Sequence, residues 1–197
     1  MSNLTVNLNK GINISPVAFM FACPGQKEQE AGRVVAGSTG KNLDRLLSSL
    51  SQSSNIQLRA LFPSTNRYDY LITNASNIIH YPALDGRSLP LKKEYMKEKN
   101  IERLREELKD VRFVIAFGTQ AKEVSAAVAA AYESKNTEQR PFFITSLPHL
   151  SFLSLNQISR DVSGDEIMKG DNEGTTKRIE VVREMVEKAI KEAVTCE

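Results

Sequence analysis

The sequence predicts an α/β fold, a three-layer α/β/α sandwich with a central, mainly parallel four-stranded sheet. Three observations predict it. Four short apolar segments alternate with amphipathic segments, an order typical of a parallel sheet with helices on both faces. The chain has 197 residues, of which 41% are hydrophobic, enough for one sizeable core. No internal repeat is visible, and we therefore expect a single domain over residues 1–197.

The four expected strands are short, apolar and rich in β-branched or aromatic side chains, as buried strands of a parallel sheet are. They cover residues 17–22, 70–74, 112–117 and 142–145. Because parallel strands end at the same edge of a sheet, a ligand is expected at their carboxyl ends. Unusual residues collect there, and each lies at or just beyond the end of an expected strand: Ala22, Asn74, Gly118 and His149.

Apolar side chains recur at helical spacing in three segments. The first carries Leu43, Leu46, Leu47 and Leu50, the second Ile101, Leu104, Leu108 and Val111, and the C-terminal helix, about residues 176–194, carries Ile179, Val182, Val186, Ala189, Ile190 and Ala193. The serine-rich residues 48–55 predict a loop, and residues 159–176, with glycines and no periodicity, predict a mobile surface loop. The mixed charges of residues 92–112 indicate a solvated helix face, to which we assign no nucleic-acid contact.

Composition limits the function only weakly. The formal net charge of +2 permits a nucleic-acid partner without requiring one, since charges of both signs are interspersed. Two cysteines, Cys23 and Cys196, give neither a disulfide framework nor a metal spacing, so no metal and no cofactor are expected. The longest apolar run is too short to span a bilayer and follows no signal-peptide pattern. We expect a cytoplasmic monomer without membrane contact.

The loop after the first expected strand has the residues of a site-building turn. Pro24 and Gly25 are followed by Glu28, and glycines lead through Gly37 and Gly40 into a helix. Such a loop can direct backbone N–H groups and a helix N-terminus at an anion. Taken alone, the glycines fit a plain strand-to-helix turn equally well, and the Lys-Ser/Thr ending of nucleotide-hydrolase loops is missing.

Four segments in combination resemble the uracil-DNA glycosylase superfamily over about residues 16–155. The segment from Phe21-Ala22-Cys23-Pro24-Gly25 to Gly37 is similar to the first motif of the iron–sulfur branch, Ile72-Thr73-Asn74 to its base-reading strand, residues 114–121 to its Gly-x-x-Ala junction, and His149-Leu150-Ser151-Phe152-Leu153 to the His-Pro-Ser-Pro-Leu motif of the founding branch. No one of these segments is specific alone. Their order and spacing carry the resemblance.

The resemblance implies a DNA glycosylase, which flips a base out of DNA and hydrolyses its N-glycosidic bond. The base leaves as an anion while the sugar gains oxocarbenium character. In the family roles, His149 would hydrogen-bond the departing base, Asn74 would read its Watson–Crick edge, and Leu153 would fill the vacated stack. Glu28 or Asn74 would position the water.

The resemblance also places the remaining site residues. The catalytic set is His149, Asn74 and Glu28; the base pocket is Ala22, Cys23, Pro24, Gly25, Val35 and Asn74; and the DNA-binding set is Gly37, Ser38, Thr39, Lys41, Gly118, Thr119, Ser151 and Leu153. Read without the resemblance, His149 could be a structural histidine and Asn74 could simply end a strand at a turn.

Several family residues are replaced. Ala22 stands where the family has a polar water-activating side chain, and Val35 stands where a phenylalanine stacks on uracil. Such stacking contributes about 1–3 kcal/mol, so its loss argues against ordinary uracil selectivity. Leu150 replaces proline, and the iron–sulfur ligands are missing, with Ile78 close to where one belongs. The chain therefore resembles a divergent member without the cluster, with a larger and less polar pocket.

Three functions stay open on the sequence alone. The first is an active glycosylase for a damaged or modified base, bulkier than uracil, which leaves an abasic site. The second is a catalytically inactive DNA-binding relative of the same fold. The third is a small-molecule or nucleotide-binding protein that shares only the topology. A bulky modified base would suit defence against viruses with altered DNA.

Overall fold

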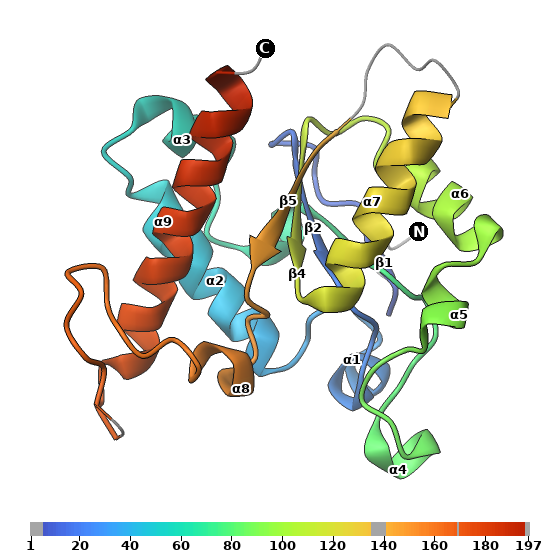
Figure 1. Ribbon diagram of the computed structural model, residues 1–197, viewed down its shortest axis with the longest axis horizontal. Helices are drawn as coiled ribbons and strands as arrows, with labels where there is room; N and C mark the ends of the chain where they lie inside the picture. Colours follow the sequence, from blue (N-terminus) through green and yellow to red (C-terminus); the bar gives the residue numbers. More distant parts are fainter. Residues whose placement is uncertain (1–5, 135–140, 169, 196–197) are drawn as a thin grey trace.

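The structure, a computed structural model, describes residues 6–134, 141–168 and 170–195 (Figure 1). Within these ranges the sheet has five strands in the order β1-β3-β2-β4-β5. Their bounds are β1 Leu8–Asn9, β2 Val17–Phe21, β3 Leu71–Asn74, β4 Phe113–Phe117 and β5 Phe142–Leu147. All four predicted strands are present and pair in parallel with one another. The predicted mainly parallel α/β sheet is therefore confirmed.

The predicted strand number of four is wrong by one. β1 pairs antiparallel with the edge of β3, where Leu8 lies opposite Thr73 and Asn9 opposite Ile72. Two residues are too few to show a strand alternation in sequence, so nothing in the residue pattern marked this segment. The Asn9 side chain fixes it further by donating to the carbonyl oxygens of Tyr68 and Tyr70, at 2.9 and 2.7 Å.

The helices follow the strands in the predicted alternation. They are α1 Gln26–Ala31, α2 Ser38–Ser51, α3 Ile56–Leu61, the 3-10 turn η1 Arg67–Asp69, α4 Pro82–Asp85, α5 Lys92–Tyr95, α6 Glu98–Glu107, α7 Thr119–Ser134, α8 Phe152–Leu155 and α9 Gly174–Thr195. The predicted loop at residues 48–55 is wrong in its first half, because α2 continues to Ser51 to bury Leu50. The predicted C-terminal helix is confirmed as α9.

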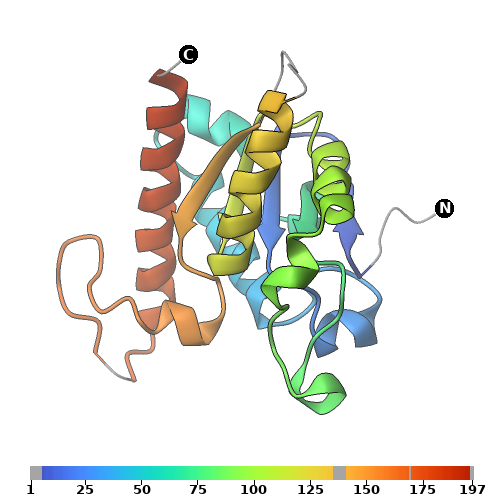
Figure 2. The same cartoon turned by 45° about the vertical axis from the view of Figure 1, so that its right-hand side comes forward.

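Two apolar layers enclose the sheet, and the period of the strands explains them. Side chains of a strand point alternately to the two faces. On β2, Phe19 and Phe21 join the core under α2, α3 and α9, whereas Ala18 and Met20 join the core under α5, α6 and α7. Figures 1 and 2 show these two helix groups on opposite sides of the sheet. The three-layer sandwich is thus confirmed.

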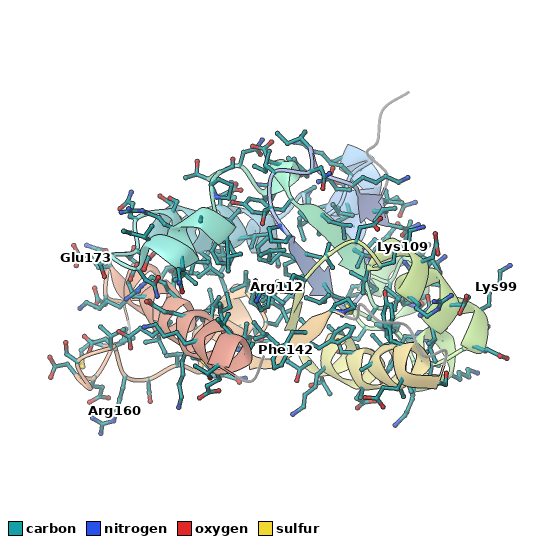
Figure 3. The ribbon with its side chains drawn as sticks, turned by 90° about the horizontal axis from the view of Figure 1, so that it is seen from above. Lys99, Lys109, Arg112, Phe142, Arg160 and Glu173 are labelled. Carbon is teal, nitrogen blue, oxygen red and sulfur yellow. The ribbon has the colours of Figure 1, made fainter. Side chains whose placement is uncertain are left out.

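The two ends of the sheet differ. At the carboxyl ends of the parallel strands lie α1, α4 and α8, at the lower edge of Figure 1. The opposite end is seen in Figure 3, with Arg112 and Phe142 at the starts of β4 and β5. Residues 159–173, within the predicted surface loop, join α8 to α9 and carry an antiparallel bridge between Arg160 and Glu166. Residue 169 lies outside the described residues.

Among residues 6–134, 141–168 and 170–195, no helix combines the length and the apolar character that a bilayer crossing requires.

Candidate active site

A pocket of about 160 Å³ opens at the carboxyl ends of the parallel strands, where the sequence predicted a ligand site. It is lined by Phe21, Ala22, Cys23, Gly25, Glu28, Val35, Thr39, Asn74, Ser88, Leu89 and His149. The three residues of the predicted catalytic set line it together, although they come from α1, β3 and the segment after β5. Of the predicted base-pocket residues, Pro24 is the one that does not line it.

His149 is held in one protonation state by its surroundings. Its Nδ1 accepts a hydrogen bond from the backbone N–H of Ser151, at 3.1 Å, and therefore carries no proton. Burial lowers the pKa of His149 below its ordinary value of 6.5, and nearby Glu28 opposes that shift only in part. The imidazole is thus neutral at pH 7 with its proton on Nε2. Its ring meets the edge of the Phe21 ring, with centroids 5.9 Å apart.

Gly118 lies directly beside His149. The glycine has a φ of 88° and follows β4, and a Cβ there would lie 3.5 Å from the Cβ and Cδ2 of His149. The left-handed backbone, which other residues adopt at a cost, lets the β4 end turn away directly beside the histidine. Gly118 therefore lies beside the predicted catalytic histidine, and Thr119 starts α7 directly after it.

Asn74 ends β3 and is 3% exposed. Its side-chain Nδ2 lies 3.5 Å from the carbonyl oxygen of Asn7, a long hydrogen bond. The position of the strand end is fixed from α6, because Arg103 donates to the backbone oxygen of Asn74 at 2.8 Å and pairs with Glu107. Arg103 belongs to the mixed-charge segment for which we expected no nucleic-acid contact, and the contacts of its side chain are with the protein.

Glu28 ties the first pocket loop together. Its Oε2 accepts from the N–H of Gly25 and its Oε1 from the N–H of Ala36, both at 3.0 Å. The carboxylate thus joins the start of α1 to the turn before α2. A carboxylate oxygen has two lone pairs, so each keeps one acceptor site besides its backbone partner.

Val35 occupies an unusual backbone conformation at the pocket wall. Its φ is +42°, in the left-handed region that β-branched residues rarely adopt, at a cost of about 1–2 kcal/mol. The backbone of Val35 packs closely against the start of α2. A Cβ on Gly40 would lie 1.8 Å from the Val35 carbonyl oxygen. Only glycine at position 40 permits this approach. Val35 is 5% exposed and lines the pocket.

Cys23 is half-buried. Burial raises the pKa of its thiol to about 12, and the carboxylates of Glu28, Glu94 and Asp85 act in the same direction. The thiol is therefore protonated at neutral pH and unreactive as a nucleophile. Cys196 lies outside the described residues. With two cysteines, the chain does not fit an iron–sulfur cluster, which takes four thiolates.

The predicted DNA-binding residues lie on two sides of the strand ends. Gly37 precedes α2, and Ser38, Thr39 and Lys41 belong to its first turns. Ser151 caps α8 by accepting from the Ser154 N–H at 3.3 Å. Leu153, on α8, is 79% exposed, a large apolar side chain in solvent. Thr39 is the member of this set that lines the pocket.

Sequence reasoning missed three pocket residues: Phe21, which it placed in the first motif but not in the pocket, and Ser88 and Leu89, which lie between α4 and α5. No periodicity or motif marks this segment. The signal that could have pointed to it is His80, one of two histidines in the chain, which the structure buries to 2% exposure near the pocket loop. Its backbone N–H donates to the Pro24 oxygen at 3.0 Å.

Comparison with known families agrees with the geometry of this pocket. The model of the uracil-DNA glycosylase superfamily matches residues 16–166, which hold every residue of the pocket. No match was found among curated proteins. Because the family match covers most of the chain, the protein belongs to the uracil-DNA glycosylase superfamily, a family of DNA glycosylases.

Proposed function

We propose that the protein is a monofunctional DNA glycosylase that extrudes a modified or damaged base, bulkier than uracil, and hydrolyses its N-glycosidic bond to leave an abasic site. The observation that carries the proposal is the neutral His149, which lines the same pocket as Asn74 and whose Nδ1 accepts from a backbone N–H.

His149 fits the demand of the chemistry. The base leaves with negative charge on its carbonyl oxygens, and a fixed donor in a water-poor site stabilises that charge. The Nε2–H of His149 is such a donor. Its orientation costs nothing during the reaction, because the Ser151 N–H already holds the ring through Nδ1. Asn74 supplies an amide donor and acceptor for the edge of the base.

Positioning of the water falls to Glu28 or Asn74, because Ala22 has no polar group. Glu28 supports this role with the lone pairs that its two backbone hydrogen bonds leave over. No lysine lines the described pocket, and Cys23 is protonated, so hydrolysis by water fits the pocket better than attack by an amine or a thiolate.

The apolar side of the pocket supports a base other than uracil. Ala22, Cys23 and Val35 offer no stacking ring and little polarity. A base with a substituent on its ring can occupy the space that the family's phenylalanine and carboxylate would take. Such a substrate would connect the protein to defence against viruses with altered DNA.

The alternative is an inactive DNA-binding relative. It is favoured by one observation, that the carboxylate nearest to the pocket is already engaged by two backbone N–H groups while position 22 is alanine.

One assay separates the two. Single- and double-stranded DNA carrying uracil, hypoxanthine, xanthine, hydroxymethylated cytosine or glucosylated cytosine is incubated with the protein and then treated with alkali. Strand scission at one of these bases, and not at ordinary bases, is the expected result. Binding without scission at any of them would reject the enzyme in favour of the binding relative.

A further inference from the structure

The pocket has a wall that its family motifs do not supply. Ser88 and Leu89 line it from the segment between α4 and α5, which lies beside α1 at the lower edge of Figure 1. Leu89 is 49% exposed, so a large apolar side chain borders the pocket and solvent at once. Cys23 contacts this wall, with its Sγ 3.9 Å from the Ser88 carbonyl oxygen.

A polar network with one buried member, His80, and three partly exposed members holds this wall in place. At its centre is the side chain of His80, whose Nδ1 hydrogen-bonds Asp85 Oδ2 at 2.6 Å. Its buried Nε2 lies 3.2 Å from Glu94 Oε2 without making a hydrogen bond. Arg87 joins the same two carboxylates, at 2.8 Å to Asp85 and 3.3 Å to Glu94. His80 and Arg87 each contact both carboxylates, so the four side chains form a closed ring of contacts. This ring links the two ends of the segment between α4 and α5.

The network holds the segment at both ends. Before it, the Arg87 N–H donates to Asp85 Oδ1 at 3.2 Å. After it, the Leu91 N–H donates to Glu94 Oε2 at 2.6 Å. The hydrogen bond from His80 holds the pKa of Asp85 below its usual range. Burial opposes ionisation of Glu94, yet the Leu91 N–H and Arg87 hold its pKa low as well. Both carboxylates stay charged at neutral pH.

The network is also joined to the first pocket loop, because the His80 N–H donates to the Pro24 oxygen at 3.0 Å. The position of Leu89 is therefore set relative to Cys23 and Gly25, the two pocket residues on either side of that proline.

We propose that Leu89 contacts the extruded base and determines which bases the pocket accepts, and that His80 is a positioning residue that sets Leu89 through Asp85 and Glu94. This inference rests on the proposed function. An apolar contact of this kind selects by size, since one methylene group in such a pocket changes selectivity about 10- to 200-fold.

The test compares Leu89→Ala with Leu91→Ala, a matched control. Leu91 is 44% exposed on the same segment and does not line the pocket. Single-turnover rates are measured on duplexes that carry uracil, hypoxanthine, hydroxymethylcytosine or glucosylated cytosine. In Leu89→Ala, the ratio of the rates on the largest and the smallest accepted base should rise by about tenfold or more, because the pocket widens. Leu91→Ala should keep the wild-type ratio.

The outcomes are distinct. An unchanged ratio in a Leu89→Ala protein that still excises its base overturns the role of Leu89 and leaves the proposed function standing. Wild-type and Leu91→Ala proteins that excise no base reject the proposed function, and the selection by Leu89 with it.

The positioning role has its own variants. His80→Phe removes both polar contacts of the ring, whereas His80→Asn keeps an amide that can reach Asp85. Arg87→Gln weakens the same network from a partly exposed side chain. It therefore tests the positioning role even if the substitutions at buried His80 prevent folding. His80→Phe and Arg87→Gln should shift the base ratio in the same direction as Leu89→Ala, and His80→Asn should restore most of the wild-type ratio. Folded His80→Phe and Arg87→Gln proteins with a wild-type ratio overturn the positioning role.

Discussion

The two loops that enclose the pocket are held by different kinds of interaction. The first loop, residues 22–40, is fixed through its backbone, by the two hydrogen bonds of Glu28 and by the contact between Val35 and Gly40. The second loop, residues 80–94, is fixed mainly by contacts between the side chains of His80, Asp85, Arg87 and Glu94, beside two backbone N–H groups that donate to the carboxylates. Backbone clamps tolerate few residues at a position. Side-chain networks leave the intervening residues free to vary, and Leu89 lies among those residues.

The largest expected effect is a loss of stability, caused by a substitution that disrupts the first loop. Gly40→Ala puts a Cβ 1.8 Å from the Val35 carbonyl oxygen, so the loop or the start of α2 must move. We expect a loss of about 4 kcal/mol or more in the free energy of unfolding, in the range of severe single substitutions. Gly37→Ala is the control, because its Cβ would meet Lys27 at an ordinary 3.5 Å. Urea denaturation measures both, and equal stabilities would contradict the clamp.

A second prediction compares the two kinds of clamp directly. Glu28→Gln removes a charge that accepts two backbone N–H groups and should cost about 1–3 kcal/mol of unfolding free energy. Arg87→Gln should cost less stability while changing base selectivity, because the ion pairs of the second loop are partly open to solvent. Glu30→Gln, on the exposed face of α1, is the control and should have little effect. A larger loss of unfolding free energy for Arg87→Gln than for Glu28→Gln would refute the contrast between the loops.

Larger side chains at positions 22 and 35 should fill the part of the pocket that the first loop borders. Val35→Phe combined with Ala22→Glu returns a ring and a carboxylate to the pocket, and phenylalanine also removes β-branching from a left-handed position. Uracil excision should rise, since stacking of a base on a ring contributes about 1–3 kcal/mol, and excision of a bulkier base should fall. A folded double variant without uracil activity would remove these two positions from the base pocket.

The smallest expected effect lies outside both loops. Leu153, 79% exposed on α8, is the predicted wedge. Leu153→Ala should slow excision from duplex DNA more than from single strands, because only the duplex has a stack to prop open. Asn74→Ala should slow excision from both substrates, because it removes recognition of the base itself. If Leu153→Ala slows excision equally from duplex and single-stranded DNA, Leu153 does not act as the wedge.

The same contrast explains what the sequence could predict. The first loop was recognisable because Pro24, several glycines and Glu28 stand at fixed spacings that the backbone itself requires. The strands were predictable from apolar runs, while β1 escaped because two residues show no alternation. The second loop was missed, because His80, Asp85, Arg87 and Glu94 interact across uneven spacings that match no period. The catalytic roles of His149, Asn74 and Glu28 remain predictions, although the fold brings all three to one pocket.

The most direct test of the central claim is the rate of abasic-site formation by His149→Ala, on the base that the wild-type protein excises. If the neutral imidazole stabilises the departing base, the single-turnover rate should fall about 100- to 1000-fold, as for the loss of an oxyanion-stabilising donor. DNA affinity and the unfolding midpoint should stay close to wild type. A folded His149→Ala protein that forms abasic sites at the wild-type rate would contradict the account.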